Sequence, residues 1–205
     1  MSININNDDI NNINNSISNI DNNNNINNIE NITNINFTET STELKNIDHY
    51  LINSILKKGS YSTIYLATCQ YTSQQVCIKQ INKRFLKVYI HDYSLIHNEI
   101  TSLKLLKHKN ILTLYEIYES KNFIYLITEY IDGPDLFEEI IKKKRFSENE
   151  SLYIFSQLID ALVYMHKMNI THRDIRTEHI LFTKSNNIPK IIDFGYSTCY
   201  KKIVN

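Results

Sequence analysis

The sequence predicts an α+β fold of two lobes, in which a β-rich lobe with one helix precedes a mostly helical lobe. From about residue 47 to residue 132, short runs rich in Ile, Tyr, Val and Thr are interrupted by one segment with helical spacing. After Gly133-Pro134 the apolar residues recur at helical spacing instead. We therefore place the junction between the two lobes near Asp132.

The start of the chain has a different composition. The first 36 residues contain 17 Asn and 10 Ile. Isoleucines at positions 10, 13, 17 and 20 step by three and four, which leaves an amphipathic helix or coiled-coil seam open. Asn is a poor helix former, and Asn-rich tracts are usually disordered or prone to β-aggregation. We expect a disordered low-complexity tail over residues 1–46 and a folded domain over residues 47–205.

The expected elements follow from hydrophobic period. Strands are expected over residues 50–57, 62–70, 75–82, 112–120 and 123–130. A helix is expected over residues 94–107, and two more over residues 136–143 and 148–167. Ser147 and Glu150 have the S-x-x-E spacing of a capping box, so the last of these helices should begin directly after Ser147.

Composition narrows the function classes. Lys plus Arg and Asp plus Glu are equal at 22 each, so no net charge favours nucleic acid or an anionic membrane as a partner. No apolar run approaches the ~18 residues of a membrane span, and no signal peptide is recognisable at the start. The three cysteines, Cys69, Cys77 and Cys199, lack metal-ligand spacing and suggest reduced thiols. We expect an intracellular protein of the cytoplasm or nucleus.

One glycine and several charged residues follow one another in an order that carries information about function. Gly59 lies in a turn between two expected strands, Lys79 ends the strand "VCIK", and Glu99 follows on the expected helix. Taken singly, each fits an ordinary turn or surface charge. "HRDIRTEHIL" at residues 172–181 and Asp-Phe-Gly at residues 193–195 come next.

In this order the motifs resemble those of the protein kinase family, of serine/threonine type, over about residues 50–200. The resemblance implies a protein-kinase-like fold, with an N-lobe and hinge over residues 47–132, and ATP and Mg²⁺ as cofactors. It implies that Lys79 contacts the nucleotide phosphates while Glu99 holds it. Asp193 is implied as the metal-binding aspartate.

The same resemblance implies further roles in catalysis and nucleotide binding. Asp174 resembles the base that accepts the proton of the substrate hydroxyl, and Arg176 stands beside it as a catalytic residue. The implied nucleotide-binding residues are Leu56, Gly59, Ile64, Cys77, Thr128, Glu129, Ile131, Asp135 and Leu181. The apolar residues implied to tie the lobes together are Leu103, Leu114, His172 and Phe194.

The chain departs from the family pattern at the second metal position. His179 stands where the family has an asparagine whose amide oxygen binds metal. Mg²⁺ prefers oxygen ligands and imidazole suits later transition metals, so we expect weak or single-site Mg²⁺ binding. The glycine-rich loop keeps only Gly59, because Lys57 and Ser62 occupy the outer glycine positions.

The chain also stops ten residues after Gly195. We therefore expect a truncated C-lobe over residues 133–205 that ends just after the D-F-G motif. The helix over residues 148–167 should then keep part of a broad apolar face uncovered, which favours a protein partner or marginal stability.

Three functions remain open from the sequence. We favour an inactive serine/threonine kinase homologue, or pseudokinase, that retains ATP binding, because of His179 and the short C-lobe. An active kinase that transfers the γ-phosphate of ATP to protein hydroxyls is the alternative, because Lys79, Glu99, Asp174 and Asp193 are all present. A non-catalytic interaction module is the third.

Overall fold

The computed structural model describes residues 45–90 and 94–200. The tail predicted over residues 1–46 lies outside this range except for its last two residues. Asn46 already belongs to the first strand, β1 (Asn46–Ile47), which pairs antiparallel with β2.

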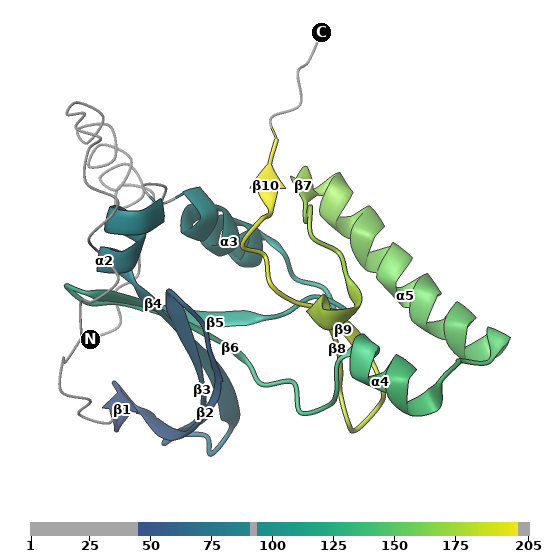
Figure 1. Ribbon diagram of the computed structural model, residues 1–205, viewed down its shortest axis with the longest axis horizontal. Coiled ribbons are helices and arrows are strands. Elements are labelled where there is room, and N and C mark those ends of the chain that lie inside the picture. The colour runs from purple at the N-terminus through teal and green to yellow at the C-terminus, as the bar shows by residue number, and fades with distance from the viewer. Residues whose placement is uncertain (1–44, 91–93, 201–205) are drawn as a thin grey trace, which may run out of the picture. The chain divides into compact units, whose positions relative to one another are not determined.

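The first half of the described chain is an antiparallel sheet of six strands in the order β1-β2-β3-β4-β6-β5 (Figure 1). The strands after β1 are β2 (Tyr50–Lys58), β3 (Ser62–Cys69), β4 (Gln75–Asn82), β5 (Leu114–Glu119) and β6 (Phe123–Glu129). Each predicted strand run has its counterpart here. β4 has the predicted bounds, whereas β5 is shorter than the predicted run at both ends.

The central strand β4 has different neighbours on its two faces. Val76 and Ile78 are buried on one face, and Cys77, Lys79 and Ile81 alternate with them on the other. Ile81 belongs to a core cluster with Leu86, Ile96 and Leu126. The face of β4 that carries Lys79 is therefore the face covered by the helical segment between β4 and β5.

That helical segment begins directly after β4. It consists of α2 (Lys83–Phe85), a short π-helix η1 (Leu86–Ile90) and α3 (Ser94–Leu105). The side chain of Asn82 accepts a hydrogen bond from the Phe85 N–H and caps α2. α3 begins where the helical spacing predicts and ends at Leu105, two residues before the predicted end.

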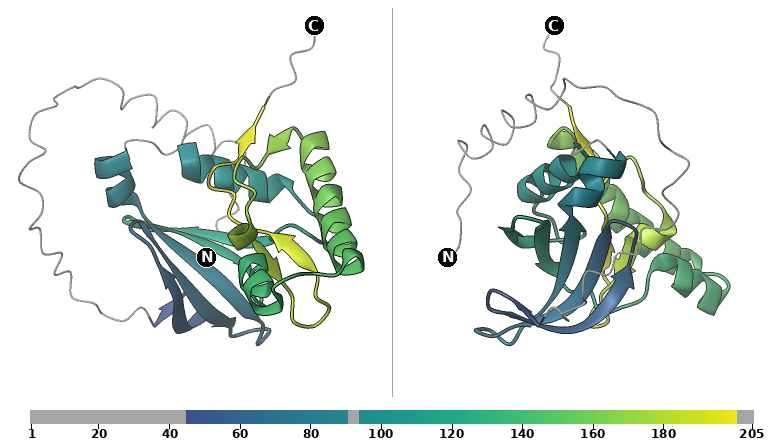
Figure 2. Two further views of the ribbon diagram at one scale, coloured as in Figure 1. Left: turned by 45° about the vertical axis from the view of Figure 1, so that its right-hand side comes forward. Right: turned by 60° about the vertical axis from the view of Figure 1, so that its left-hand side comes forward.

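The second half contains two helices and four short strands. α4 (Leu136–Lys143) and α5 (Glu148–Lys167) have the predicted bounds, and both begin with a capping box. The other elements are β7 (Ile170–Thr171), the 3₁₀ helix η2 (Thr177–His179), β8 (Ile180–Phe182), β9 (Pro189–Ile191) and β10 (Thr198–Cys199). β7 pairs with β10 and β8 with β9, and α5 packs against β7 and β9 (Figures 1 and 2).

One core cluster joins the two halves. Leu103 from α3 and Phe194 from the D-F-G segment are buried in it together with residues of α5 and the short strands. Its remaining members are Leu106, Ile111, Ile154, Leu158, Ala161, Met165, Ile170, Ile180, Phe182 and Ile191. Because α3 contributes to this cluster and also packs on the sheet, its position depends on both halves.

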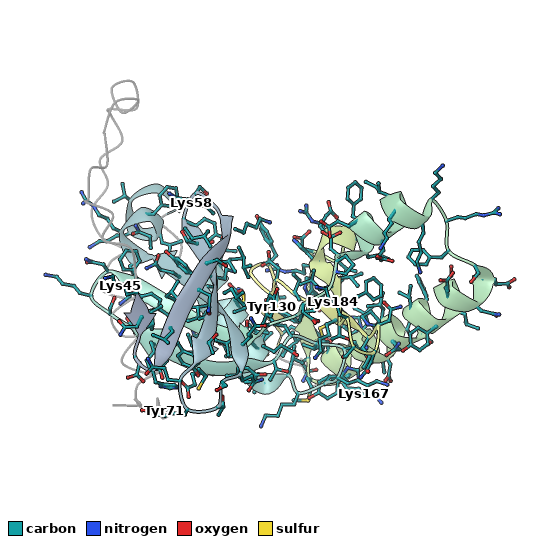
Figure 3. The ribbon with its side chains drawn as sticks, turned by 90° about the horizontal axis from the view of Figure 1, so that it is seen from below. Lys45, Lys58, Tyr71, Tyr130, Lys167 and Lys184 are labelled. Atoms are coloured by element: carbon teal, nitrogen blue, oxygen red, sulfur yellow. The ribbon has the colours of Figure 1, made fainter. Side chains whose placement is uncertain are left out.

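The connection between the halves runs past Tyr130 and close to the turn at Lys184 (Figure 3). The Lys184 backbone N–H donates to the Asp132 carboxylate at 3.0 Å, and the Phe182 N–H donates to the Pro134 carbonyl at 2.9 Å. Between these contacts, a Cβ on Gly133 would lie 2.0 Å from the Phe182 carbonyl oxygen. Glycine is required here by close backbone approach.

One side of α5 is apolar and exposed, as the sequence predicts. Leu152, Phe155, Ile159 and Val163 are each at least 45% exposed, and their spacing of three or four residues puts them on one stripe of the helix. We call these four residues the apolar face of α5. Among the helices that the structure describes, none is long and apolar enough to span a membrane.

Candidate active site

Lys79 and Glu99 form a closely bonded ion pair between β4 and α3. The Lys79 Nζ donates to both carboxylate oxygens of Glu99, at 2.7 and 2.8 Å, and the two side chains are 17% and 7% exposed. Burial opposes the charge on Lys79, but the carboxylates of Glu99 and Asp193 outweigh it and raise the Lys79 pKa above its ordinary 10.5. The ammonium therefore stays charged at a fixed position on the sheet.

Asp193 brings a second carboxylate to this ammonium. Its Oδ1 lies 3.9 Å from the Lys79 Nζ and accepts a hydrogen bond of 3.3 Å from the Gly195 N–H. Burial would raise the Asp193 pKa, yet Lys79 and the Gly195 N–H lower it below 3.8. Asp193 has a φ of 60°, in the left-handed region that non-glycine residues seldom adopt. Such backbone conformations cluster at functional sites.

Phe194 anchors the segment that carries Asp193. Its side chain is fully buried, and its ring meets the His172 ring edge-on with centroids 4.7 Å apart. Leu103 lies in the same core cluster, and Leu114 packs against it. The structure thus brings together the four residues that the sequence predicted to tie the lobes.

His172 connects the segment before Asp174 to the segment before Asp193. Its Nε2 donates to the Ile192 carbonyl at 2.9 Å, and its Nδ1 accepts from the Asp174 N–H at 3.3 Å. Burial lowers the His172 pKa below 6.5, which keeps the ring neutral and allows it to accept at Nδ1. The position of Asp174 therefore depends on a neutral, buried histidine.

His179 lies between the carboxylates of Asp174 and Asp193. Its Nδ1 is 3.0 Å from the backbone carbonyl oxygen of Asp174 and 3.3 Å from the Asp174 Oδ2, and its Nε2 is 3.6 Å from the Asp193 Oδ2. The His179 side chain is only 12% exposed. Lys79, Glu99, Asp193, His179 and Asp174 are thus linked by contacts in one continuous series.

Arg176 lies at the edge of this group. Its side chain is 54% exposed, and its Nε is 3.8 Å from the Glu178 Oε2. Arg173, which the sequence did not single out, is also exposed, and its Nε donates to the Tyr196 carbonyl at 2.6 Å. Arg173 also has a left-handed φ of 67°. It connects the catalytic-loop segment to the residues after Gly195.

The predicted nucleotide-binding residues on the sheet share the face of Lys79. Ile64 is directly opposite Lys79 in the β3–β4 register, and Thr128 is opposite Cys77 in the β4–β6 register. Residues opposite each other across strands project from the same face, as do alternate residues along a strand. Burial raises the pKa of the Cys77 thiol to about 11, so this thiol stays protonated.

The remaining predicted nucleotide-binding residues lie in the β2–β3 hairpin, just after β6, or in contacts between β8 and the start of α4. Gly59 donates its N–H to the Ser62 carbonyl at 2.8 Å and closes the β2–β3 turn, and Leu56 in β2 is exposed. Ile131 is buried just after β6. Leu181 in β8 forms an isolated bridge with Asp135, whose carboxylate accepts from the Glu138 N–H at 2.7 Å and caps α4. The Asp135 carboxylate therefore has a structural role.

Glu129 is held by both halves of the fold. Its Oε1 accepts from the Thr113 N–H at 2.7 Å and from the Lys190 Nζ at 2.8 Å. Glu129 was predicted only as a nucleotide-binding residue, and Lys190 was not predicted to have a role. No sequence signal pairs two charges 61 residues apart, so only the structure reveals this anchor.

Comparison with known proteins agrees with this geometry. A family profile described as "Protein kinase domain" matches residues 50–204. The chain belongs to the protein kinase family. Its resemblance to the serine/threonine type and its protein-kinase-like fold are thereby confirmed.

Individual kinases match most of this kinase domain. The chain is 39% identical over 168 residues to "Calcium-dependent protein kinase 4" of Plasmodium berghei, covering 80% of this chain and 31% of that protein. It is 37% identical over 158 residues to "NUAK family SNF1-like kinase 1" of Mus musculus, covering 77% and 24%. It is 35% identical over 152 residues to "CBL-interacting protein kinase 15" of Oryza sativa subsp. japonica, covering 74% and 34%. The chain spans about a quarter to a third of the length of these relatives.

Kinase domains in general use ATP and Mg²⁺, and the residues present fit the nucleotide better than they fit two Mg²⁺ ions. A buried, charged Lys79 fits a multiply anionic phosphate group, and Asp193 supplies oxygen for one metal ion. At the position where the resemblance implies a second metal ligand, the side chain is the imidazole of His179. The described residues contain no group of three or more His, Cys, Asp or Glu side chains that could hold a metal by themselves. Further ligands for a metal at Asp193 would come from the nucleotide or from water.

Proposed function

We propose that this kinase domain binds ATP with a divalent metal ion and transfers the γ-phosphate poorly in Mg²⁺, as an impaired serine/threonine kinase homologue. The observation that carries this proposal is the position of His179 between Asp174 and Asp193. Phosphoryl transfer depends almost entirely on positioning and charge neutralisation. Loss of one oxygen ligand for metal therefore reduces the rate of the chemical step more than it reduces nucleotide binding.

The intact part of the site supports nucleotide binding. Lys79 is fixed by Glu99 and offers its charge to phosphate oxygens, as a point charge without competing hydrogen-bond acceptors. Ile64, Cys77 and Thr128 share the face of Lys79 and would lie beside the adenine. Asp193 would hold the metal, which when bound neutralises charge on the phosphates.

The intact part of the site also retains a residue for proton transfer. Asp174 is 30% exposed and is held through its own N–H by His172, so its carboxylate can meet a substrate hydroxyl and accept its proton. The names of the relatives include the word kinase, which favours retention of some of this chemistry. The expected deficit is therefore in rate, with the reaction type unchanged.

Phosphotransfer from radiolabelled ATP in Mg²⁺ to a generic serine/threonine peptide tests the proposal. The original chain should have little activity, and His179→Asn should raise it roughly tenfold or more by restoring an amide oxygen. Adding Asp174→Ala to that variant should abolish the gain. Strong activity of the original chain that depends on Asp174 but not on position 179 would identify a working kinase and overturn the proposal.

A second candidate, a protein-interaction module, is favoured by the apolar face of α5. Four large apolar side chains in a single exposed stripe are typical of a surface that a protein partner covers. A thermal-shift series with millimolar ATP and metal separates the two candidates. Binding at a hundred times the Kd stabilises the folded state by about 2.7 kcal/mol, whereas a pure interaction module should show no shift.

We also propose an intracellular location, in the cytoplasm or nucleus. The support is that Cys69, Cys77 and Cys199 are all free thiols in the structure. Cell fractionation with an antibody to the chain tests this location, and recovery of the protein from the secreted fraction would contradict it.

A further inference from the structure

The hydrogen bond of His179 to the chain determines which ring nitrogen carries the proton. The Nδ1 lies 3.0 Å from the Asp174 backbone carbonyl oxygen, which can only accept, so the Nδ1 is the donor. In the neutral ring, the Nε2 then presents its lone pair. The Nε2 lies 3.6 Å from the Asp193 Oδ2, which is also an acceptor. Two acceptors that face each other at this distance are both satisfied by a positive charge between them, either a proton on the Nε2 or a metal ion.

The two oxygens of Asp193 have different neighbours. Its Oδ1 accepts from the Gly195 N–H and faces the Lys79 ammonium, whereas its Oδ2 faces His179. The contacts of Oδ1 therefore fix the carboxylate and leave Oδ2 directed at the imidazole. The His179 ring is oriented by the hydrogen bond from its Nδ1–H to the Asp174 carbonyl oxygen. Histidines that bind a metal through one ring nitrogen commonly donate the other ring N–H to a carbonyl or carboxylate in this way. The His179 Nε2 and the Asp193 Oδ2 are thus both held in position by hydrogen bonds and charges on the other atoms of their own side chains.

The separation and chemistry of this pair suit some metals better than others. Nitrogen and oxygen ligands lie about 2.0–2.2 Å from Zn²⁺, so two of them on one tetrahedral ion are about 3.4 Å apart, close to the 3.6 Å observed. Mg²⁺ requires octahedral oxygen ligands at about 2.0–2.1 Å, whose neighbours lie about 2.9 Å apart. Imidazole nitrogen is a favoured ligand of late first-row ions and a poor one for Mg²⁺.

We propose that the Nε2 of His179 and the Oδ2 of Asp193 form a nitrogen–oxygen ligand pair for the ion that accompanies the nucleotide, which makes this domain prefer Zn²⁺ and Co²⁺, and more weakly Mn²⁺, to Mg²⁺. The inference rests on the proposed ATP binding, because two protein ligands need phosphate oxygens to complete the site.

The direct test is pulsed EPR of the full chain with Mn²⁺ and ATP, which detects nitrogen bound to the metal. The original chain should show a ¹⁴N coupling that is lost in His179→Asn. His166→Asn is the matched control, because His166 is an exposed histidine in the last turn of α5 and should leave the coupling unchanged. Thermal melts of all three proteins show whether each variant is folded.

Equilibrium binding gives a second measurement on the same proteins. The Kd for ATP is measured in Mg²⁺ and in Mn²⁺, and the ratio of the first to the second should be higher for the original chain than for His179→Asn. Comparing the variants cancels the intrinsic difference between the two metals in binding free ATP. Co²⁺ and Zn²⁺ are tested in the same way, and for each of them the ratio should be higher by about tenfold or more.

The possible results separate this inference from the proposed function. ATP binding with metal, but without a nitrogen coupling and with equal Kd ratios in both proteins, would overturn the inference alone and indicate a simple His179–Asp193 ion pair. An absence of ATP binding with every metal would overturn the proposed function and the inference together. A coupling that His179→Asn removes and His166→Asn retains supports both.

Discussion

Ser102 in α3 and Ser197 after the D-F-G segment share a buried hydrogen bond of 2.7 Å between their hydroxyl oxygens, across 95 residues of sequence. The Ser197 hydroxyl also donates to the Phe194 carbonyl at 2.6 Å, so the Ser102 hydroxyl is the donor of the pair. Both residues are at most 1% exposed. The helix that carries Glu99 is thereby bonded to the segment that carries Asp193.

This serine pair predicts strong non-additivity. Ser197→Ala leaves the buried Ser102 hydroxyl without its partner and should lower the free energy of unfolding by about 1–3 kcal/mol. Ser102→Ala should cost less, and the double variant should cost clearly less than the sum of the two. Urea denaturation measures all three, with Ser156→Ala on the exposed side of α5 as the control. Additive costs would show that the two hydroxyls are energetically independent.

Gly133 should be intolerant of a methyl group. In Gly133→Ala the new Cβ would lie 2.0 Å from the Phe182 carbonyl oxygen, and this backbone is fixed by the Phe182–Pro134 hydrogen bond. No described glycine has a positive φ, so the cost is steric and not torsional. We expect a loss of about 1–3 kcal/mol or more in chemical denaturation.

Gly59→Ala is the matched control for Gly133→Ala, because its Cβ would lie 3.3 Å from the Ser62 carbonyl oxygen in an exposed turn. Its effect on unfolding should be much smaller. Equal losses for the two variants would mean that the segment at Gly133 moves aside freely, and would remove the packing argument for glycine there.

Much of the fold could be predicted because its elements carry a clear period. β4, α4 and α5 have the predicted bounds, and the capping box at Ser147 is present. The segment Lys83–Ile90 was missed because its charged and apolar residues follow neither period, and its helix depends on the Asn82 cap and on Leu86 in the core. Strands of two or three residues, such as β7 and β10, are too short to show alternation.

The site could be predicted by residue type but not by contact. The order of motifs indicated Lys79, Glu99, Asp174 and Asp193, and the structure brings them together. That His179 contacts both aspartates could not be predicted, because it depends on the turn of the chain between residues 174 and 179. The capping role of Asp135 was also not visible, since the same carboxylate could serve the helix or a ligand.

The Lys79–Glu99 pair predicts a large cost for removing one partner. Lys79→Met leaves the Glu99 carboxylate, in a residue only 5% exposed, without its cation, and should destabilise the fold by about 3–5 kcal/mol. Lys79→Met combined with Glu99→Leu should recover most of this loss, because an apolar pair can fill the same space. Unfolding curves with and without ATP separate the effect on fold stability from the effect on nucleotide binding. Neither variant should be stabilised by ATP, because both lack the Lys79 ammonium. Failure of the second change to restore stability would contradict the buried-charge argument.

Buried, neutral His172 predicts a loss of stability in mild acid. Its folded pKa lies below 6.5, so the unfolded chain binds more protons as pH falls through 6.5, and the free energy of unfolding decreases there. The lowered pKa of Asp193 acts only below about 3.8, outside this window, although His179, Asp193 and Asp174 all influence the ring. His172→Leu removes the titration and should flatten the pH dependence between pH 7 and the folded pKa, whereas exposed His166→Asn should not. Urea unfolding at successive pH values measures the slopes, and parallel slopes for His172→Leu and the original chain would show that His172 is not protonated on unfolding.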